Sequence, residues 1–142
     1  MKNKLLFSLL IISALSAGSC SSTKSLSGML KSLTGNNWEL VNLMGQPAYQ
    51  GDFGGTLPFL SFQDGGRLTG STGCNTMRGN YNLMENGLIS LDPGSLTRKA
   101  CEGNGEARVL DALKSVTNLK LDKGRLSLLD GATEVLSFAA KK

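Results

Sequence analysis

Short runs in which apolar and polar residues alternate are frequent after residue 35 and predict a β-rich domain. The clearest run is 38–43, where a period of two places Trp38, Leu40 and Asn42 on one side of a half-buried strand. The tripeptide Glu85-Asn86-Gly87 separates two further runs and predicts a hairpin. We expect about eight short strands, at residues 38–43, 57–62, 67–71, 80–84, 88–91, 119–121, 125–129 and 135–138.

One stretch, after Cys101, has helical periodicity instead. Ala107, Leu110 and Leu113 recur at helical spacing, Asn104 is suited to the N-cap and Glu106 to the first turn. Short hairpin links require antiparallel pairing, because parallel strands need long crossovers. The expected fold class is therefore α+β and mostly β: an antiparallel half-barrel of about eight short strands packed on one amphipathic helix, which covers its open side.

The N-terminal segment has the pattern of an export signal. Basic residues precede an apolar run at 5–15, and small residues follow it. The tetrapeptide Ala17-Gly18-Ser19-Cys20 resembles the lipobox of bacterial lipoproteins, in which the cysteine is lipidated and becomes the mature N-terminus. An ordinary secretory signal with an incidental cysteine is the alternative. We expect a lipoprotein signal peptide at 1–19, a lipidated tether at 20–34 and one domain at 35–142.

The expected location is the cell envelope. Stable attachment to the membrane would come from the acyl chains on Cys20. The serine that follows Cys20 resembles the outer-membrane sorting pattern, so we expect an anchor in the outer membrane, on its periplasmic face. Serine, glycine and lysine are abundant in the tether, which favours a flexible linker. Leu26, Met29, Leu30 and Leu33 nevertheless fall at helical spacing and leave a short helix open.

Composition excludes several kinds of site. The chain of 142 residues has a formal charge of +4 and no block of clustered cations, which argues against a nucleic-acid partner. It contains no histidine, which excludes Ser-His-Asp and Cys-His catalysis and His-ligated zinc. We therefore expect no catalytic residue, no cofactor and no metal ligand. An acid–base hydrolase that uses Asp52, Asp64 or Asp92 remains the enzymatic alternative.

Two cysteines remain in the domain if Cys20 is lipidated. In an oxidising compartment Cys74 and Cys101 are expected to form a structural disulfide, with two free thiols or a reactive cysteine as alternatives. Neither cysteine lies in a Cys-x-x-Cys motif, and no histidine is present to lower a thiol pKa.

Glycine spacing near Cys74 superficially resembles a phosphate loop. Gly70, Gly73 and Gly79 lead from strand to strand and not into a helix, so bulges and tight corners are expected, with Asn75 bonded to its own backbone. The aromatic residues are expected in the core: Trp38, Phe59, Phe62, Tyr81 and Phe138. Three basic residues, Arg78, Arg98 and Lys99, are expected to lie on the solvated surface, and the alternative is that they form an exposed binding patch.

Several short motifs occur in one order along the domain. They include Gly65-Gly66-Arg67-Leu68-x-Gly70, Gly73-Cys74-Asn75 and Thr97-Arg98-x-Ala100-Cys101. Together they resemble the META domain family (DUF306), to which the heat-shock lipoprotein HslJ belongs. The residues that carry the family motif are Trp38, Gly70, Gly73, Cys74, Asn75, Gly79, Tyr81, Thr97 and Cys101.

The resemblance implies a bacterial role in envelope stress or resistance, because HslJ is heat-inducible and linked to aminocoumarin tolerance. The function we expect is a non-catalytic lipoprotein that binds an envelope protein or a lipid. A secretion accessory or a protease-inhibitor-like protein is the alternative, and a hydrolase that uses acidic residues is a weaker one.

Overall fold

The computed structural model describes residues 25–141. The predicted signal peptide at 1–19 and the predicted lipidation site, Cys20, lie outside these residues. The helices are α1 (Leu26–Thr34), α2 (Gly105–Ser115) and the short 3-10 helices η1 (Gln50–Phe53) and η2 (Glu85–Gly87). The strands are β1 (Asn37–Leu43), β2 (Gln46–Pro47), β3 (Phe59–Gln63), β4 (Arg67–Ser71), β5 (Thr76–Leu83), β6 (Ile89–Leu96), β7 (Asn118–Asp122), β8 (Arg125–Asp130) and β9 (Thr133–Lys141).

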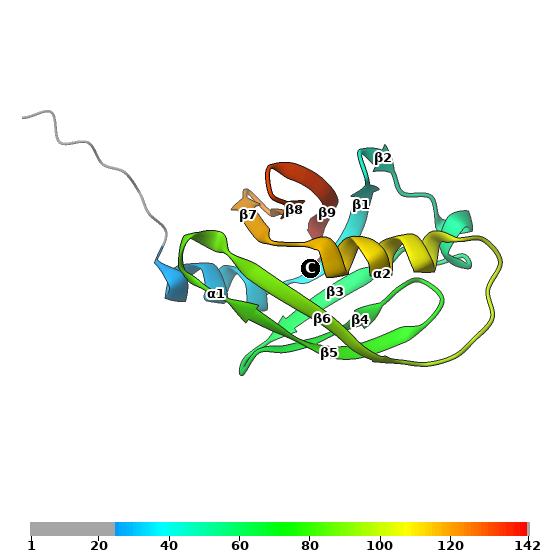
Figure 1. Ribbon diagram of the computed structural model, residues 1–142, viewed down its shortest axis with the longest axis horizontal. Helices are drawn as coiled ribbons and strands as arrows, with labels where there is room; N and C mark the ends of the chain where they lie inside the picture. Colours follow the sequence, from blue (N-terminus) through cyan, green and yellow to red (C-terminus); the bar gives the residue numbers. More distant parts are fainter. Residues whose placement is uncertain (1–24, 142) are drawn as a thin grey trace, which may run out of the picture.

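The strands form one curled antiparallel sheet, with α2 lying across its open side (Figure 1). The strand order is β6-β5-β4-β3-β1-β9-β8-β7, and β2 pairs only with β1. The two edge strands meet at one end, where Leu88 bridges to Asn118 and the Ile89 N–H donates to the Thr117 carbonyl oxygen at 2.9 Å. The predicted half-barrel is thereby confirmed.

The core lies between the concave side of the sheet and α2. Helix α2 contacts β6 and β9 and buries Val109, Ala112 and Leu113. The helix begins after Asn104, as predicted, but the Asn104 side chain makes no capping hydrogen bond, so its expected role as a side-chain cap is wrong. Burial of the apolar stripe of α2, and not capping, is therefore what stabilises this helix in place.

A second helix, α1, lies where the sequence left a linker or a helix open. The Ser25 hydroxyl oxygen accepts a hydrogen bond from the Gly28 N–H at 3.3 Å and so caps the helix. Leu33 is fully buried, and its carbonyl oxygen accepts a hydrogen bond from Trp38 Nε1 at 2.9 Å. The flexible-linker interpretation is wrong for residues 26–34, because these contacts join α1 to the folded domain.

Two side chains differ from the pattern expected of them. A register shift between Leu40 and Asn42 in the β1–β9 pairing moves Leu43 into the core instead of Asn42. Phe59 is 40% exposed, although the other four aromatic residues expected in the core are buried. Its side chain lies on the outer face of the sheet because it alternates with the buried Leu60.

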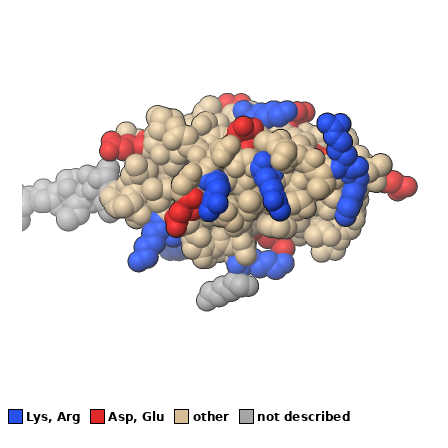
Figure 2. Space-filling model, turned by 90° about the horizontal axis from the view of Figure 1, so that it is seen from below, with Lys and Arg blue, Asp and Glu red and all other residues tan. Residues whose placement is uncertain are grey.

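The exposed charge is mixed. Figure 2 shows one face of the molecule, on which Lys and Arg side chains are interspersed with Asp and Glu. Two ion pairs are present among residues 25–141, Arg125 with Glu134 and Lys141 with Glu39, and both are exposed. Exposed pairs of this kind contribute little to stability.

Candidate functional site

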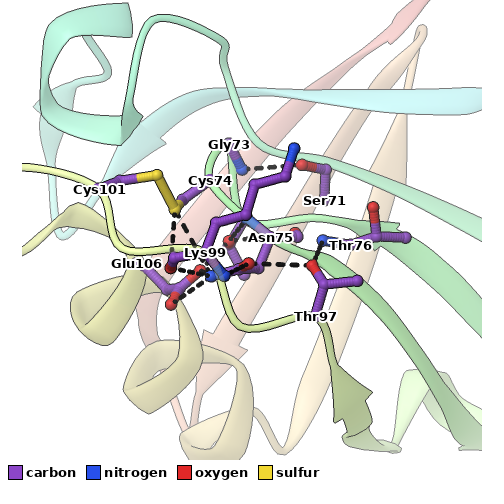
Figure 3. The surroundings of a disulfide bond; sticks show 10 residues. Ser71, Gly73, Cys74, Asn75, Thr76, Thr97, Lys99, Cys101 and Glu106 are labelled. Atoms are coloured by element: carbon purple, nitrogen blue, oxygen red, sulfur yellow. Dashed lines mark hydrogen bonds between the residues drawn. A yellow bond between two sulfur atoms is a disulfide. The ribbon is translucent and has the colours of Figure 1, made fainter.

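A disulfide joins Cys74 and Cys101, whose Cα atoms are 6.0 Å apart (Figure 3). Cys74 lies in the β4–β5 loop and Cys101 lies in the segment that leads into α2. The structure therefore has the disulfide that the sequence predicts, and the alternatives of free thiols or a reactive cysteine do not describe it. The bond connects the curled sheet to the helix that covers it.

Asn75, the next residue, is buried, with 2% of its surface exposed. Its Oδ1 accepts hydrogen bonds from the Lys99 N–H at 2.7 Å and from Thr97 Oγ1 at 2.9 Å. Its Nδ2 donates to the Lys99 carbonyl oxygen at 3.1 Å and to the carboxylate of Glu106 at 2.8 Å. The expectation that this side chain bonds its own backbone is wrong, because its partners come from two distant segments.

Thr72 completes this cluster from the other side of the loop. Its buried hydroxyl donates to Glu106 Oε2 and accepts from the Asn75 N–H at 2.9 Å. No buried side-chain nitrogen or oxygen lacks a hydrogen-bond partner among the described residues. We call Thr72, Asn75, Thr97, Lys99 and Glu106 the corner network. Because its buried polar groups are already paired, it has none to spare for a ligand.

The glycines of the motif are required by close packing. A Cβ on Gly73, which has a φ of +91°, would lie 2.4 Å from Phe53 Cβ, and a Cβ on Gly79 would lie 1.8 Å from the Asp92 carbonyl oxygen. A Cβ on Gly70 would lie 2.2 Å from the Phe59 carbonyl oxygen. These glycines allow the tight corners and close strand contacts that were expected of them, and none precedes a helix as in a phosphate loop.

Tyr81 is also used inside the fold. Its hydroxyl donates to the Gln63 carbonyl oxygen at 3.0 Å, and its ring meets Phe62 edge-to-face with centroids 5.1 Å apart. Burial, with a smaller contribution from the negative charge of Asp64, raises the pKa of Tyr81 above its ordinary value. Like the corner network, this residue of the family motif therefore holds structural elements together.

The three aspartates considered for acid–base chemistry lie on separate elements. Asp52 is in η1, Asp64 is in the β3–β4 turn, and Asp92 is in β6, where its Oδ1 accepts from the Gly94 N–H at 2.9 Å. A pocket of about 240 Å³ beside the disulfide is lined by Asp52 together with Glu102 and Glu106, a combination that the sequence did not reveal. Glu106 is hydrogen-bonded within the corner network, whereas Asp52 comes from η1 and Glu102 from the segment before α2.

The outer face of β3, β4 and β5 carries a different feature. A shallow groove of about 680 Å³ is lined there by Phe59, Arg67 and Arg78, with Thr69 and Asn80 between the arginines. We call this feature the outer groove. Among the residues that the structure describes, neither arginine side chain has an ion-pair or hydrogen-bond partner, and the lining contains no carboxylate. The groove is therefore suited to an anionic group.

The basic residues considered for a binding patch are divided between two places. Arg78 lines the outer groove, whereas Arg98 and Lys99 line a separate hollow of about 590 Å³ at the end of β6. Arg67, which was not among the basic residues considered for binding, lines the groove together with Arg78. The two arginines lie on the paired strands β4 and β5. In this pairing Arg67 lies opposite Asn80, and Thr69 lies opposite Arg78. The alternation of residues 67–80 could have shown that Arg67 and Arg78 lie on exposed strand faces. It could not have shown that β4 and β5 pair in the register that brings the two arginines into one groove.

Two further kinds of feature are absent from residues 25–141. No helix in this part of the chain is long and apolar enough to cross a bilayer. No group of three or more His, Cys, Asp or Glu side chains in the same part is arranged to hold a metal ion.

Comparisons with known proteins place the chain among others of similar fold. Residues 31–142 match the family described as the META domain. One similar structure is a protein solved by NMR, with 22% identity, a TM-score of 0.59, and coverage of 78% of this chain and 92% of that chain. Another is the crystal structure at 1.00 Å of a DUF4847 family protein from Bacteroides vulgatus ATCC 8482, with 16% identity, a TM-score of 0.61, and coverage of 79% and 96%. At these identities the two structures support the fold alone. No curated protein matches.

Proposed function

Because the chain belongs to the META domain family, as its motifs indicate, we propose that it is a non-catalytic lipoprotein of the bacterial envelope that binds an anionic group of an envelope protein or lipid. In this proposal Cys20 carries the lipid and the periplasmic face of the outer membrane is the site of attachment. The resemblance to HslJ supports a role in envelope stress or resistance.

The outer groove carries the binding part of the proposal. Arg67 and Arg78 lie on paired strands and make no ion pair with any residue that the structure describes, and they line the groove together with Phe59, which is 40% exposed. A guanidinium binds carboxylate or phosphate through two parallel hydrogen bonds, and an exposed aromatic ring adds apolar contact area. This combination of charge and exposed ring supports recognition of an anionic partner.

The non-catalytic part is supported by how the motif residues are used. Asn75, Thr97 and Glu106 bond to one another or to backbone, and the two domain cysteines bond to each other. Hydrolysis by Asp52, Asp64 or Asp92 has less support, because these carboxylates come from three separate elements. A secretion accessory or an inhibitor-like protein would use the same exposed face, and identification of the partner distinguishes between them.

Intact-mass measurement of the membrane-extracted protein tests the anchor. We expect a chain that begins at Cys20, carries acyl mass and lacks two hydrogens because of the Cys74–Cys101 bond. A chain that begins at Cys20 without acyl mass, or one that retains residues 1–19, would contradict the lipoprotein assignment.

Affinity purification of the full-length protein from detergent-solubilised envelope tests the groove. The variant Arg67→Gln/Arg78→Gln is expected to lose the protein or lipid that the wild type retains. The control Arg108→Gln/Lys114→Gln removes the same charge from α2 and is expected to retain it. Equal recovery by both double variants would contradict recognition through the outer groove.

A further inference from the structure

The end of the domain where α1 begins has exposed apolar side chains. Met84 and Leu88 are each 44% exposed and flank η2 at the tip of the β5–β6 hairpin. The Met84 N–H donates to the Leu88 carbonyl oxygen at 2.8 Å, so both side chains are held on one closed hairpin. Figure 1 shows this hairpin beside the start of α1 and near β7, at the end opposite η1.

A hollow of about 410 Å³ continues the same apolar end. It is lined by Met29 of α1, by Asn86 and Gly87 of the hairpin, and by 119–122 of β7, which contribute two leucines. Leu26, Met29 and Leu30 are only partly buried, so the apolar side of α1 is not fully covered by the core. We call Leu26, Met29, Met84 and Leu88, with this hollow, the apolar end.

Charged residues of both signs border the apolar end. Lys31 and Lys120 lie on α1 and β7, Glu85 lies in η2, Asp122 lies at the end of β7, and Lys123 follows it in the β7–β8 turn. Because cations and anions are interspersed there, the property that distinguishes this end is its exposed apolar surface.

The position of Cys20 indicates what meets this end. Four residues, 21–24, lie between Cys20 and Ser25, the first residue that the structure describes, and the five steps from one to the other span at most about 18 Å. A domain of this size is roughly 35 Å across. With a lipid on Cys20, the distance from the start of α1 to the bilayer is therefore smaller than the width of the domain. If the opposite end of the domain faced the bilayer, the start of α1 would lie farther from the bilayer than this tether reaches.

From these relations we propose that the apolar end docks on the bilayer that holds the Cys20 lipid, with Met84 and Leu88 inserted at the boundary between headgroups and acyl chains. The inference rests on the lipid anchor of the proposed function. Docking leaves η1 facing away from the membrane, because η1 lies at the other end of the domain (Figure 1). The disulfide faces away with it, because Cys74 and Cys101 line one pocket with Asp52 and Phe53 of η1. The membrane then fixes the orientation of the domain as well as its location.

Quenching of an introduced tryptophan by brominated lipids tests the docking. Full-length lipidated protein with Leu88→Trp is reconstituted into vesicles of phosphatidylethanolamine and phosphatidylglycerol, brominated near the headgroup end of the acyl chains. Apolar side chains of interfacial segments enter about 5–10 Å into this boundary. About half of the fluorescence that the introduced tryptophan adds to that of Trp38 should therefore be lost. The native Trp38 is buried and supplies a baseline that is measured with the unmutated protein.

The matched control is Tyr49→Trp. Tyr49 is 66% exposed and directly precedes η1, at the opposite end, so its added emission should stay unchanged. Met84→Trp is a second reporter in case Leu88→Trp fails to fold, and it should behave like Leu88→Trp. Protein that floats with the vesicles but shows equal quenching at both ends would overturn the docking while the anchor stands. Protein without acyl mass that does not float would overturn both the anchor and the docking.

Discussion

The side-chain amide of Asn75 donates to both carboxylate oxygens of Glu106, at 3.1 Å and 2.8 Å. Asn75 lies just before β5, and Glu106 lies in the first turn of α2, 31 residues later. This contact joins the β4–β5 loop to the helix that covers the sheet, beside the Cys74–Cys101 bond. A covalent bond and a buried polar network therefore stabilise the same corner (Figure 3).

Asn75→Ala is expected to destabilise the domain by about 3 kcal/mol, because the Glu106 carboxylate and the Lys99 N–H lose buried partners. Urea denaturation of the full chain measures this loss. Asn82→Ala changes the same residue type at an exposed position of β5 and should shift stability by less than about 0.5 kcal/mol. Equal effects of the two substitutions would mean that the corner network contributes no specific stability.

Removal of the disulfide by Cys74→Ser/Cys101→Ser should lower the free energy of unfolding by about 3.5 kcal/mol. This estimate is the chain-entropy value for a sequence separation of 27 residues. The corner network should keep the fold native-like, so circular dichroism in the absence of urea should match that of the wild type. Reduction of the wild type with dithiothreitol should lower the free energy of unfolding by the same amount. An unchanged midpoint of urea denaturation after reduction would contradict a structural role for the disulfide.

Gly79→Ala is expected to cost about 3 kcal/mol, because the new methyl group would overlap the Asp92 carbonyl oxygen and force β5 away from β6. Gly51→Ala is the control, because a Cβ there meets nothing within 4 Å. Thermal unfolding of both variants should show a clear drop in Tm for the first and almost none for the second. A similar Tm for both would mean that the β5–β6 contact relaxes without cost.

Tyr81 predicts how stability declines in alkali. The pKa of Tyr81 is raised in the folded state above the ordinary value of 10.0. The contribution of this residue to the free energy of unfolding is therefore fully present below about pH 10, and it is lost as the pH rises through the pKa of the folded state. Tyr81→Phe should remove this part of the alkaline decline and should cost about 1 kcal/mol at neutral pH through loss of the bond to Gln63. Tyr49 is exposed, so Tyr49→Phe should leave the dependence of the unfolding free energy on pH unchanged. If the pH profile of Tyr81→Phe ran parallel to that of the wild type, ionisation of Tyr81 would not be coupled to unfolding.

The regions that the sequence predicted well are those where local pattern and burial agree. The β3–β4 turn at Asp64-Gly65-Gly66 and the hairpin at Asn86-Gly87 occur where their residues predict them. Helix α2 also follows from its apolar spacing. In these segments the preferred backbone conformation and the buried face are set by neighbours within a few residues, so a single sequence contains enough information.

Helix α1 shows where this information was insufficient. Its apolar spacing is helical, but Gly28 and three serines at 25–32 give it weak intrinsic helix propensity. Burial of Leu33 and the bond from Trp38 to its carbonyl oxygen depend on how the sheet curls. The choice between linker and helix was therefore made by packing, which the sequence pattern does not contain.

By itself, the sequence determined the mostly β composition, the antiparallel hairpins, the position of α2 and the pairing of two cysteines, because these follow from local periodicity, turn chemistry and counting. The family was indicated by the resemblance of the motifs and their order along the chain. Only the tertiary structure decided that Asn75 bonds to Glu106, that Arg67 and Arg78 share one groove, and that Met84 and Leu88 lie at the same end as the start of α1. Each of these depends on strand register and sheet curvature, which bring together residues from separate segments. A pattern along the chain records which face a side chain takes, but not which distant side chain it meets there.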